Sequence, residues 1–158
     1  MKTLKQFFGM AIATTLLFTA CDKTDDAQCA TEQYKKDINL HTSQWPKTTD
    51  WEEFRMKRFL CGEGKLEDEQ FDLHVDVTSH KGAKRLLILM VYLNNDFTGG
   101  ETIFPIFNDA IKPIKGRLIM FPPTWNYLHK GNPPLKPGFA KYFLMTYVNY
   151  ALSEQNEQ

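Results

Sequence analysis

The segment His74-Val75-Asp76 places two metal-binding side chains one residue apart. Side chains on a β-strand alternate between the two faces, so His74 and Asp76 are expected to share a face. A second histidine, His129, lies far along the sequence and can reach the same point only if the chain folds back on itself. Two imidazoles and one carboxylate on one side of a metal form a facial triad with open coordination positions, which is typical of non-haem Fe(II). The spacing therefore predicts a strand-borne metal site.

The stretches around these residues follow one another in a specific order: FDLHVD (71–76), KRLLILMVYLNNDFTGGETIF (84–104), KGRLIMFPPTWNYLHKGNP (115–133) and GFAKY (138–142). In this order they resemble the prolyl 4-hydroxylase-like branch of the 2-oxoglutarate/Fe(II) dioxygenases. That family has a His-x-Asp strand, an apolar strand ending in Tyr-Leu-Asn, a Gly-Gly-Glu turn, a distal His-x-Gly and then a basic residue before an aromatic one. The resemblance implies one dioxygenase domain over residues 51–151.

The resemblance also implies roles for individual residues. His74, Asp76 and His129 would be the catalytic ligands of Fe(II), and Lys141 would bind the far carboxylate of 2-oxoglutarate, where other members use arginine. On a strand over 140–149, Lys141 lies on an apolar face, and a charge there needs a counter-ion. The residues alone leave simpler interpretations open: a structural histidine, a turn aspartate and an edge lysine that reaches solvent.

The reaction implied by the resemblance is hydroxylation of a substrate, with O₂ consumed and 2-oxoglutarate converted to succinate and CO₂. Ascorbate commonly keeps the iron ferrous in this family and is expected as a further cofactor. Peptidyl proline is the leading substrate class, and other peptides, proteins and small molecules remain open. A zinc-type hydrolase is one alternative, although it leaves Lys141 without a purpose. A metal-binding jelly-roll protein without oxygenase activity is the other.

The sequence leaves open the roles of several residues near the expected site. Many family members have a tyrosine before the first metal-binding histidine, and the aligned residue here is Phe59, which has no hydroxyl. Tyr92, Thr102 or Tyr127 could supply the missing contact to the co-substrate. Tyr127 and Trp125 could also line a peptide groove, although aromatic core packing is the more common role. A competing ligand, the histidine at position 80, lies in a loop-like segment and is expected to be exposed.

Composition and patterning predict a mostly β fold. The C-terminal half is rich in aromatic and β-branched residues and is interrupted by Gly and Pro, as in all-β sandwiches and barrels. Turns separate short strands, an arrangement that matches a double-stranded β-helix, or jelly roll, preceded by a short helix within 27–40. The expected strands are 53–60, 71–77, 84–93, 101–105, 109–114, 117–121, 125–129 and 140–149. The strand over 84–93 is nearly all apolar and is expected to be buried on both faces.

Charge and turn residues add further expectations. Acidic and basic residues number 19 each, so no basic surface for nucleic acid is expected. Lys115-Gly116 predicts a tight hairpin turn, and Gly99-Gly100 predicts a sharp reversal. The charged stretch 61–70 predicts a loop before the metal strand, either a mobile flap or a solvated insertion.

The N-terminus has the features of an export signal. A basic start precedes an uncharged, largely apolar run from Phe7 to Ala20, which fits the h-region of a secretory signal. The segment LFTAC (17–21) resembles a bacterial lipobox, with Phe18 in place of the usual aliphatic residue. We expect a lipoprotein-like signal peptide over residues 1–20. The alternative is a buried N-terminal helix.

Export would place the protein in the cell envelope, anchored to the membrane only through a lipid on Cys21. Residues 21–50 would then form a tether and the short helix. Cys29 and Cys61 would remain as a possible disulfide pair outside the cytoplasm, or as two unrelated thiols. Without export the protein would be cytoplasmic.

Overall fold

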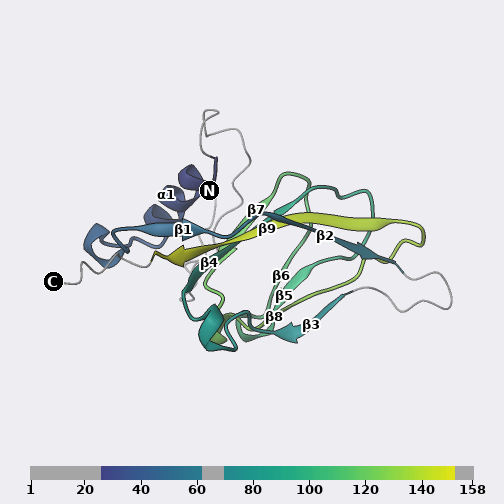
Figure 1. The fold of residues 1–158 in the computed structure, drawn as a ribbon. Helices are drawn as coiled ribbons and strands as arrows, with labels where there is room; N and C mark the ends of the chain where they lie inside the picture. The colour runs from purple at the N-terminus through teal and green to yellow at the C-terminus, as the bar shows by residue number, and fades with distance from the viewer. Residues whose placement is uncertain (1–25, 62–69, 152–158) are drawn as a thin grey trace, which may run out of the picture.

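The computed structural model describes residues 26–61 and 70–151 (Figure 1). Over these ranges the chain forms one α-helix, α1 (Asp26–Asp37), and strands that pair only in antiparallel fashion. The strands are β1 (Thr49–Trp51), β2 (Arg55–Leu60), β3 (Phe71–His74), β4 (Arg85–Tyr92), β5 (Thr102–Phe104), β6 (Asp109–Ile111), β7 (Leu118–Phe121), β8 (His129–Gly131) and β9 (Ala140–Tyr150).

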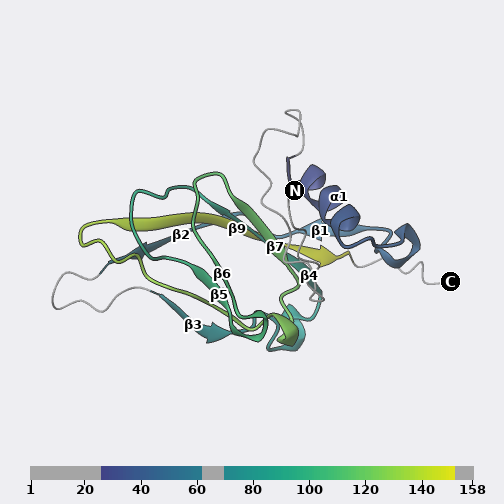
Figure 2. The same ribbon diagram turned by 180° about the vertical axis from the view of Figure 1, so that it is seen from behind.

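The strands form two sheets that lie as facing layers (Figures 1 and 2). The first sheet has the order β1-β9-β4-β7, and β2 also pairs with the long strand β9. The second sheet has the order β3-β8-β5-β6. Neighbouring strands are therefore often distant in sequence, as in a jelly roll, and the predicted mostly β fold with a short N-terminal helix is confirmed.

Strand β4 is the centre of the core because both of its faces are covered. Ile88, Met90 and Tyr92 point into the cluster between the two sheets. Leu87 and Leu89 point the other way and pack in a second cluster that includes Ala30 and Tyr34 of α1. The uniformly apolar sequence of this strand is thus explained by burial on both sides, as predicted. The helix covers the outer face of the first sheet, which leaves the inner face to build the site.

Some predicted elements are wrong. Residues 125–129 are not a strand: Trp125–Tyr127 form a 3-10 helix, and pairing begins only at His129. Strand β1 is not among the expected strands, and it pairs with the far end of β9. Gly116 does have φ of +80° in a turn, but β6 and β7 on either side pair in different sheets. Lys115-Gly116 therefore crosses between sheets and does not close a hairpin.

The sharp reversal at Gly99-Gly100 is present, since both glycines have φ of +75°, a conformation that favours glycine. No helix within the described ranges is long and apolar enough to cross a membrane. The predicted signal peptide and nearly all of the predicted 61–70 loop lie outside the described residues.

Candidate metal centre and co-substrate pocket

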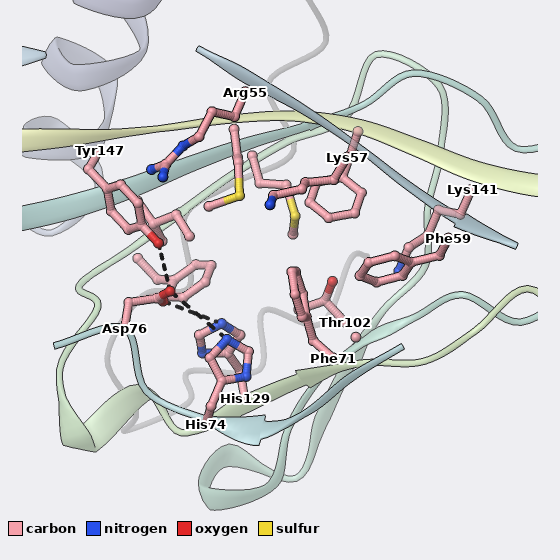
Figure 3. A pocket seen from close by; sticks show the side chains of 16 residues that line it. Arg55, Lys57, Phe59, Phe71, His74, Asp76, Thr102, His129, Lys141 and Tyr147 are labelled. Atoms are coloured by element: carbon pink, nitrogen blue, oxygen red, sulfur yellow. Dashed lines mark hydrogen bonds and ion pairs between the residues drawn. The ribbon is translucent and has the colours of Figure 1, made fainter. Parts of the chain in front are cut away.

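Three predicted metal ligands meet between the two sheets. His74 ends β3, His129 begins β8, and the two residues are directly paired across these strands. Nε2 of His74 lies 3.9 Å from one carboxylate oxygen of Asp76, and Nε2 of His129 lies 3.6 Å from the other. The three potential ligand atoms all lie within 4.8 Å of one another (Figure 3). The fold therefore brings together the residues that sequence spacing singled out.

The local backbone differs from the simple strand alternation that was expected. Strand β3 ends at His74, and its pairing with β8 shifts register between Phe71 and His74. A register shift of this kind inserts an extra residue and reverses the expected alternation. Phe71 therefore lines the same cavity as His74, with the two ring centroids 5.4 Å apart. Uninterrupted alternation would have placed Phe71 on the face opposite His74, and Asp76 lies beyond the strand end.

Hydrogen bonds orient the two imidazoles. Nδ1 of His74 lies 2.6 Å from the carbonyl oxygen of Asp72, and Nδ1 of His129 lies 2.9 Å from that of Tyr127. When Nδ1 carries the proton and donates it to a carbonyl, Nε2 presents its lone pair to a metal. Burial lowers the pKa of His129, which favours its neutral, ligating form. Both Nε2 atoms face the Asp76 carboxylate (Figure 3).

The carboxylate of Asp76 has one oxygen satisfied and one in need of a partner. Oδ1 accepts a hydrogen bond of 2.6 Å from the hydroxyl of Tyr147. Oδ2 is buried and has no hydrogen-bond partner among the described residues. A buried, unsatisfied carboxylate oxygen is costly unless a cation binds it. Two imidazole nitrogens and this oxygen are a donor set that fits Fe(II).

Tyr147 and its neighbours were missed by the sequence interpretation. The Arg85 guanidinium lies 3.8 Å from the centroid of the Tyr147 ring. Arg85 itself donates to both oxygens of Glu52, at 2.8 and 3.2 Å. Burial acts to raise the pKa of Glu52, but the hydrogen bond from Arg85 together with the positive charges of Arg85, Arg55 and Lys84 lowers it overall. Tyr147 shares the inward face of β9 with Lys141, and that alternation was the only signal in the sequence that could have found it.

Replacing Tyr147 with phenylalanine is expected to lower the affinity for Fe(II) or Mn(II) about tenfold, because groups that orient a ligand typically affect affinity by 10–100-fold. The aromatic ring, and thus its packing against Arg85, is retained. Metal titration followed by calorimetry measures the change. Tyr150→Phe is the matched control, because Tyr150 is an exposed residue on the same strand. Unchanged affinity in Tyr147→Phe would show that the hydroxyl does not position Asp76.

Lys141 lies in the same cavity as the triad. This cavity has a volume of about 280 Å³. The lysine side chain is 1% exposed, and its ammonium donates to the carbonyl oxygens of Gly100 and Asn132 at 2.9 and 3.2 Å. The ammonium also lies 4.8 Å from the ring centroid of Phe59. No carboxylate of the described residues forms an ion pair with it. The counter-ion that a buried cation needs is therefore open to a ligand.

Burial lowers the pKa of Lys141 to about 8. In the protein without co-substrate the ammonium therefore predominates below pH 8 and is lost as the pH rises above it. Because a carboxylate ligand needs the charged form, we expect the KM for 2-oxoglutarate to be constant below pH 8. Above that pH it should rise by up to about tenfold per pH unit. Succinate assays across this range measure the trend, and Lys141→Arg should abolish it because arginine stays charged.

Thr102 is the hydroxyl residue that reaches the cavity beside Lys141. Of the three candidates for the contact missing at Phe59, only Thr102 lines the cavity. Tyr92 is fully buried behind it, and the two hydroxyl oxygens lie 2.6 Å apart in a hydrogen bond. Tyr127 is also buried and packs against the ring of Phe121. Tyr127 is therefore a core residue.

The remaining aromatic and histidine candidates lie on the surface. Trp125 is 77% exposed, so it does not pack in the core as its neighbour Tyr127 does. The competing histidine, His80, is exposed in a short 3-10 helix and takes no part in the metal cluster, as predicted.

The glycine of the distal His-x-Gly, Gly131, leaves space at the floor of the cavity. A Cβ atom at this position would lie 3.1 Å from the Phe59 ring and 3.6 Å from the Lys141 ammonium. Gly131→Ala is expected to raise the KM for 2-oxoglutarate about tenfold, because overpacking typically costs 1–3 kcal/mol. Its metal affinity should stay the same, since the added methyl group is directed at Lys141. An unchanged KM in succinate assays would place the co-substrate elsewhere.

Comparison with known proteins agrees with this geometry. A family model described as the 2OG-Fe(II) oxygenase superfamily matches residues 60–149, which include the triad, Lys141 and Tyr147. The chain belongs to the 2OG-Fe(II) oxygenase superfamily. Membership in this superfamily implies Fe(II) and 2-oxoglutarate, for which the donor set around Asp76 and the charge of Lys141 are suited.

Relatives of this oxygenase include named prolyl hydroxylases. A "Putative prolyl 4-hydroxylase" of Acanthamoeba polyphaga mimivirus is 40% identical over 53 residues, a match that spans 34% of this chain and 22% of the relative's length. A solved viral collagen prolyl hydroxylase from Paramecium Bursaria Chlorella virus-1, in complex with 2OG, has a TM-score of 0.60 at 25% identity. That match covers 81% of this chain and 73% of the other.

A prolyl-4-hydroxylase of Pseudomonas putida has a TM-score of 0.57 at 16% identity, covering 88% of this chain and 71% of the other. At this level of identity the likeness concerns the fold. It agrees with the two facing sheets described above.

Proposed function

We propose that this chain is a dioxygenase that uses Fe(II) and 2-oxoglutarate to hydroxylate a substrate, with release of succinate and CO₂. One observation carries the proposal: a facial triad and a buried lysine, which forms no ion pair with a carboxylate of the described residues, line one cavity. A zinc-type hydrolase would use the triad but would leave the buried charge of Lys141 unexplained. A metal-binding jelly-roll protein without oxygenase activity would use the triad but would have no need of the buried lysine.

His74, Asp76 and His129 would hold Fe(II) through the two Nε2 atoms and Oδ2. When bound, the iron supplies the O₂ chemistry that couples decarboxylation of 2-oxoglutarate to hydroxylation of the substrate. Lys141 would bind the far carboxylate of 2-oxoglutarate and so orient the other end of the molecule towards the triad. Because the two parts of the site come from β3, β8 and β9, the packing of the two sheets fixes the distance between them.

Apolar side chains of both sheets shield the reacting groups from water. Those that line the cavity are Phe59, Phe71, Ile88, Met90, Phe121, Phe143 and Met145. In such surroundings electrostatic contacts to the co-substrate are stronger than in water, and side reactions of an oxidant with solvent are limited. Tyr147 would act as a positioning residue because it holds Asp76 and leaves Oδ2 free to bind the metal.

Peptidyl proline is the substrate class best supported by the relatives. The viral protein, at 25% identity, carries the name of a collagen prolyl hydroxylase, and the mimiviral relative that of a prolyl 4-hydroxylase. The test is incubation of the iron-loaded chain with proline-containing peptides and 2-oxoglutarate. Mass spectrometry should show a +16 Da product in amounts equal to the succinate above background. Turnover of other peptides but not of these would keep the oxygenase and reject proline.

Ascorbate is proposed as an additional cofactor that maintains ferrous iron. Its support is the common requirement in this family, and no contact in the cavity is assigned to it. Repeated turnover should decline without ascorbate and recover when it is added. Sustained activity without any reductant would reject this part of the proposal.

Export to the cell envelope with a lipid on Cys21 is likewise a proposal. It is supported by the basic start, the apolar run from Phe7 to Ala20 and the lipobox-like end. Fractionation of cells that express the full chain should place wild type with membranes and Cys21→Ser in the soluble envelope fraction. Recovery of both in the cytoplasm would contradict export.

A further inference from the structure

Two basic side chains, Arg55 and Lys57, line the cavity although neither belongs to the motifs that define the metal and co-substrate sites. They lie two residues apart on β2, and Phe59 follows at the same spacing, so all three share the face towards the cavity. Figure 3 shows Arg55 near Tyr147 and Asp76, with Lys57 extending into the space above Phe71. Burial increases along the strand from Arg55 to Phe59, so the two cations lie nearer the mouth.

The cavity holds more positive than negative charge. Asp76 is its single acidic lining residue among those described, against Arg55, Lys57 and Lys141. In the proposed function the metal uses Asp76, and the far carboxylate of 2-oxoglutarate uses Lys141. Neither the metal nor 2-oxoglutarate would therefore pair with Arg55 or Lys57.

The nearby glutamate does not remove this excess. Glu52 lies 3.0 Å from the Arg55 guanidinium, but Arg85 already bonds to both of its oxygens. One carboxylate between two guanidinium groups leaves a net positive charge. Arg55 also lies 5.3 Å from the ring centroid of Tyr147, whose hydroxyl binds the Asp76 carboxylate. The net positive charge of the two guanidinium groups therefore lies next to the metal centre.

Lys57 has fewer ion-pair partners than Arg55 among the described residues. It forms no ion pair with any described residue. Its ammonium lies 6.0 Å from the ring centroid of Phe71, which also contacts His74. A half-buried ammonium over an aromatic ring at a cavity mouth is placed to meet an anionic group that enters.

We propose that the substrate presents a carboxylate to Lys57 and Arg55 when its reacting carbon is in the cavity. This inference rests on the proposed oxygenase function and specifies its substrate class. The carboxylate can belong to an Asp or Glu side chain of a peptide, or to a small organic acid. Charge complementarity at the mouth raises the association rate and selects against neutral substrates, which would leave both cations unpaired.

Basic residues also protect edge strands from unwanted pairing, and among the described strands β2 pairs with β9 alone. That role requires side chains directed to solvent, and Arg58 on the outer face of β2 provides one. It does not account for Lys57, which is half-buried in the cavity lining, or for the position of Arg55 in that lining, although Arg55 is also exposed at the mouth. Arg58 is consequently a matched control for Lys57.

The test uses the full chain loaded with Mn(II) and 2-oxoglutarate, and a random peptide library with blocked termini. In this library only Asp and Glu carry carboxylates. Peptides retained by wild type and by Arg58→Met should be enriched about fivefold in Asp and Glu over Asn and Gln, which corresponds to ~1 kcal/mol. Lys57→Met should bring the ratio close to one. A second arm compares binding of N-acetylproline and N-acetylprolinamide, and a preference for the acid there identifies a small acid as the source.

The absence of a carboxylate preference in both arms would overturn the inference, as would a preference that survives in Lys57→Met. Anaerobic binding of Fe(II) and 2-oxoglutarate to wild type, followed by visible absorption, distinguishes failure of this substrate inference from failure of the proposed function. If the absorption band forms and no carboxylate preference exists, only the substrate inference fails. If the band does not form, the proposed function fails and this inference fails with it.

Discussion

Replacing Asp76 with alanine is expected to abolish Fe(II) binding at micromolar metal and to lower kcat/KM by about a thousandfold or more. The physical reason is that Asp76 supplies the single anionic ligand of the triad, and its Oδ2 is buried with no hydrogen-bond partner among the described residues. Two neutral imidazoles alone would compensate little of the cost of dehydrating the metal. Metal titration by calorimetry and succinate release measure the two effects.

The matched control for this prediction is Asp72→Ala. Asp72 is exposed on β3, four residues before Asp76, and orients His74 through its backbone carbonyl, which alanine keeps. Metal affinity and activity should therefore stay within about twofold of wild type, as for most surface substitutions. If Asp76→Ala still bound Fe(II) like the control, the triad would not be the metal site. Thermal unfolding of both variants without metal should show that they are folded.

Replacing Lys141 with methionine is expected to raise the KM for 2-oxoglutarate about a hundredfold or more, with little change in metal affinity. Removing one partner of a buried charge pair typically costs 2–5 kcal/mol. Methionine has a similar length and fits the apolar contacts with Phe59 and Phe143. Succinate assays over a range of 2-oxoglutarate concentrations give the KM, and metal titration gives the affinity of the triad.

Lys136→Met is the control, because Lys136 is exposed before β9 and outside the cavity. Its KM should equal that of wild type. Burial disfavours the charged form of Lys141, so its removal should not lower the melting temperature greatly, although Gly100 and Asn132 lose a donor. A normal KM in Lys141→Met would assign the co-substrate carboxylate to another cation and would contradict the proposed orientation.

The core of the site could be predicted from sequence because it depends on ordered motifs. His74, Asp76, His129 and Lys141 were identified from spacing and resemblance, and the structure places all four in one cavity. The expected strand alternation was nevertheless wrong at Phe71, because a register shift against β8 cannot be deduced from a single strand.

The support around Asp76 could not be predicted, because it depends on contacts between distant segments. The bond from Tyr147 to Asp76 joins residues 71 positions apart, and the bonds from Arg85 to Glu52 join residues 33 positions apart. No local periodicity encodes such pairs; they follow from the way β9 and β4 lie against the turn before β2. The sequence likewise did not show that Arg55 and Lys57 point into the cavity, because this direction depends on the pairing of β2 with β9.

The most direct test of the central claim is visible absorption of the purified full chain after anaerobic addition of Fe(II) and then 2-oxoglutarate. Wild type should show a weak metal-to-ligand charge-transfer band, because chelation of the iron by 2-oxoglutarate requires the triad and Lys141 in one cavity. His74→Ala should show no band, and Lys141→Met should need far more 2-oxoglutarate to produce it. A wild-type chain that binds Fe(II) but forms no band at any 2-oxoglutarate concentration would show that the cavity does not bind 2-oxoglutarate at the metal.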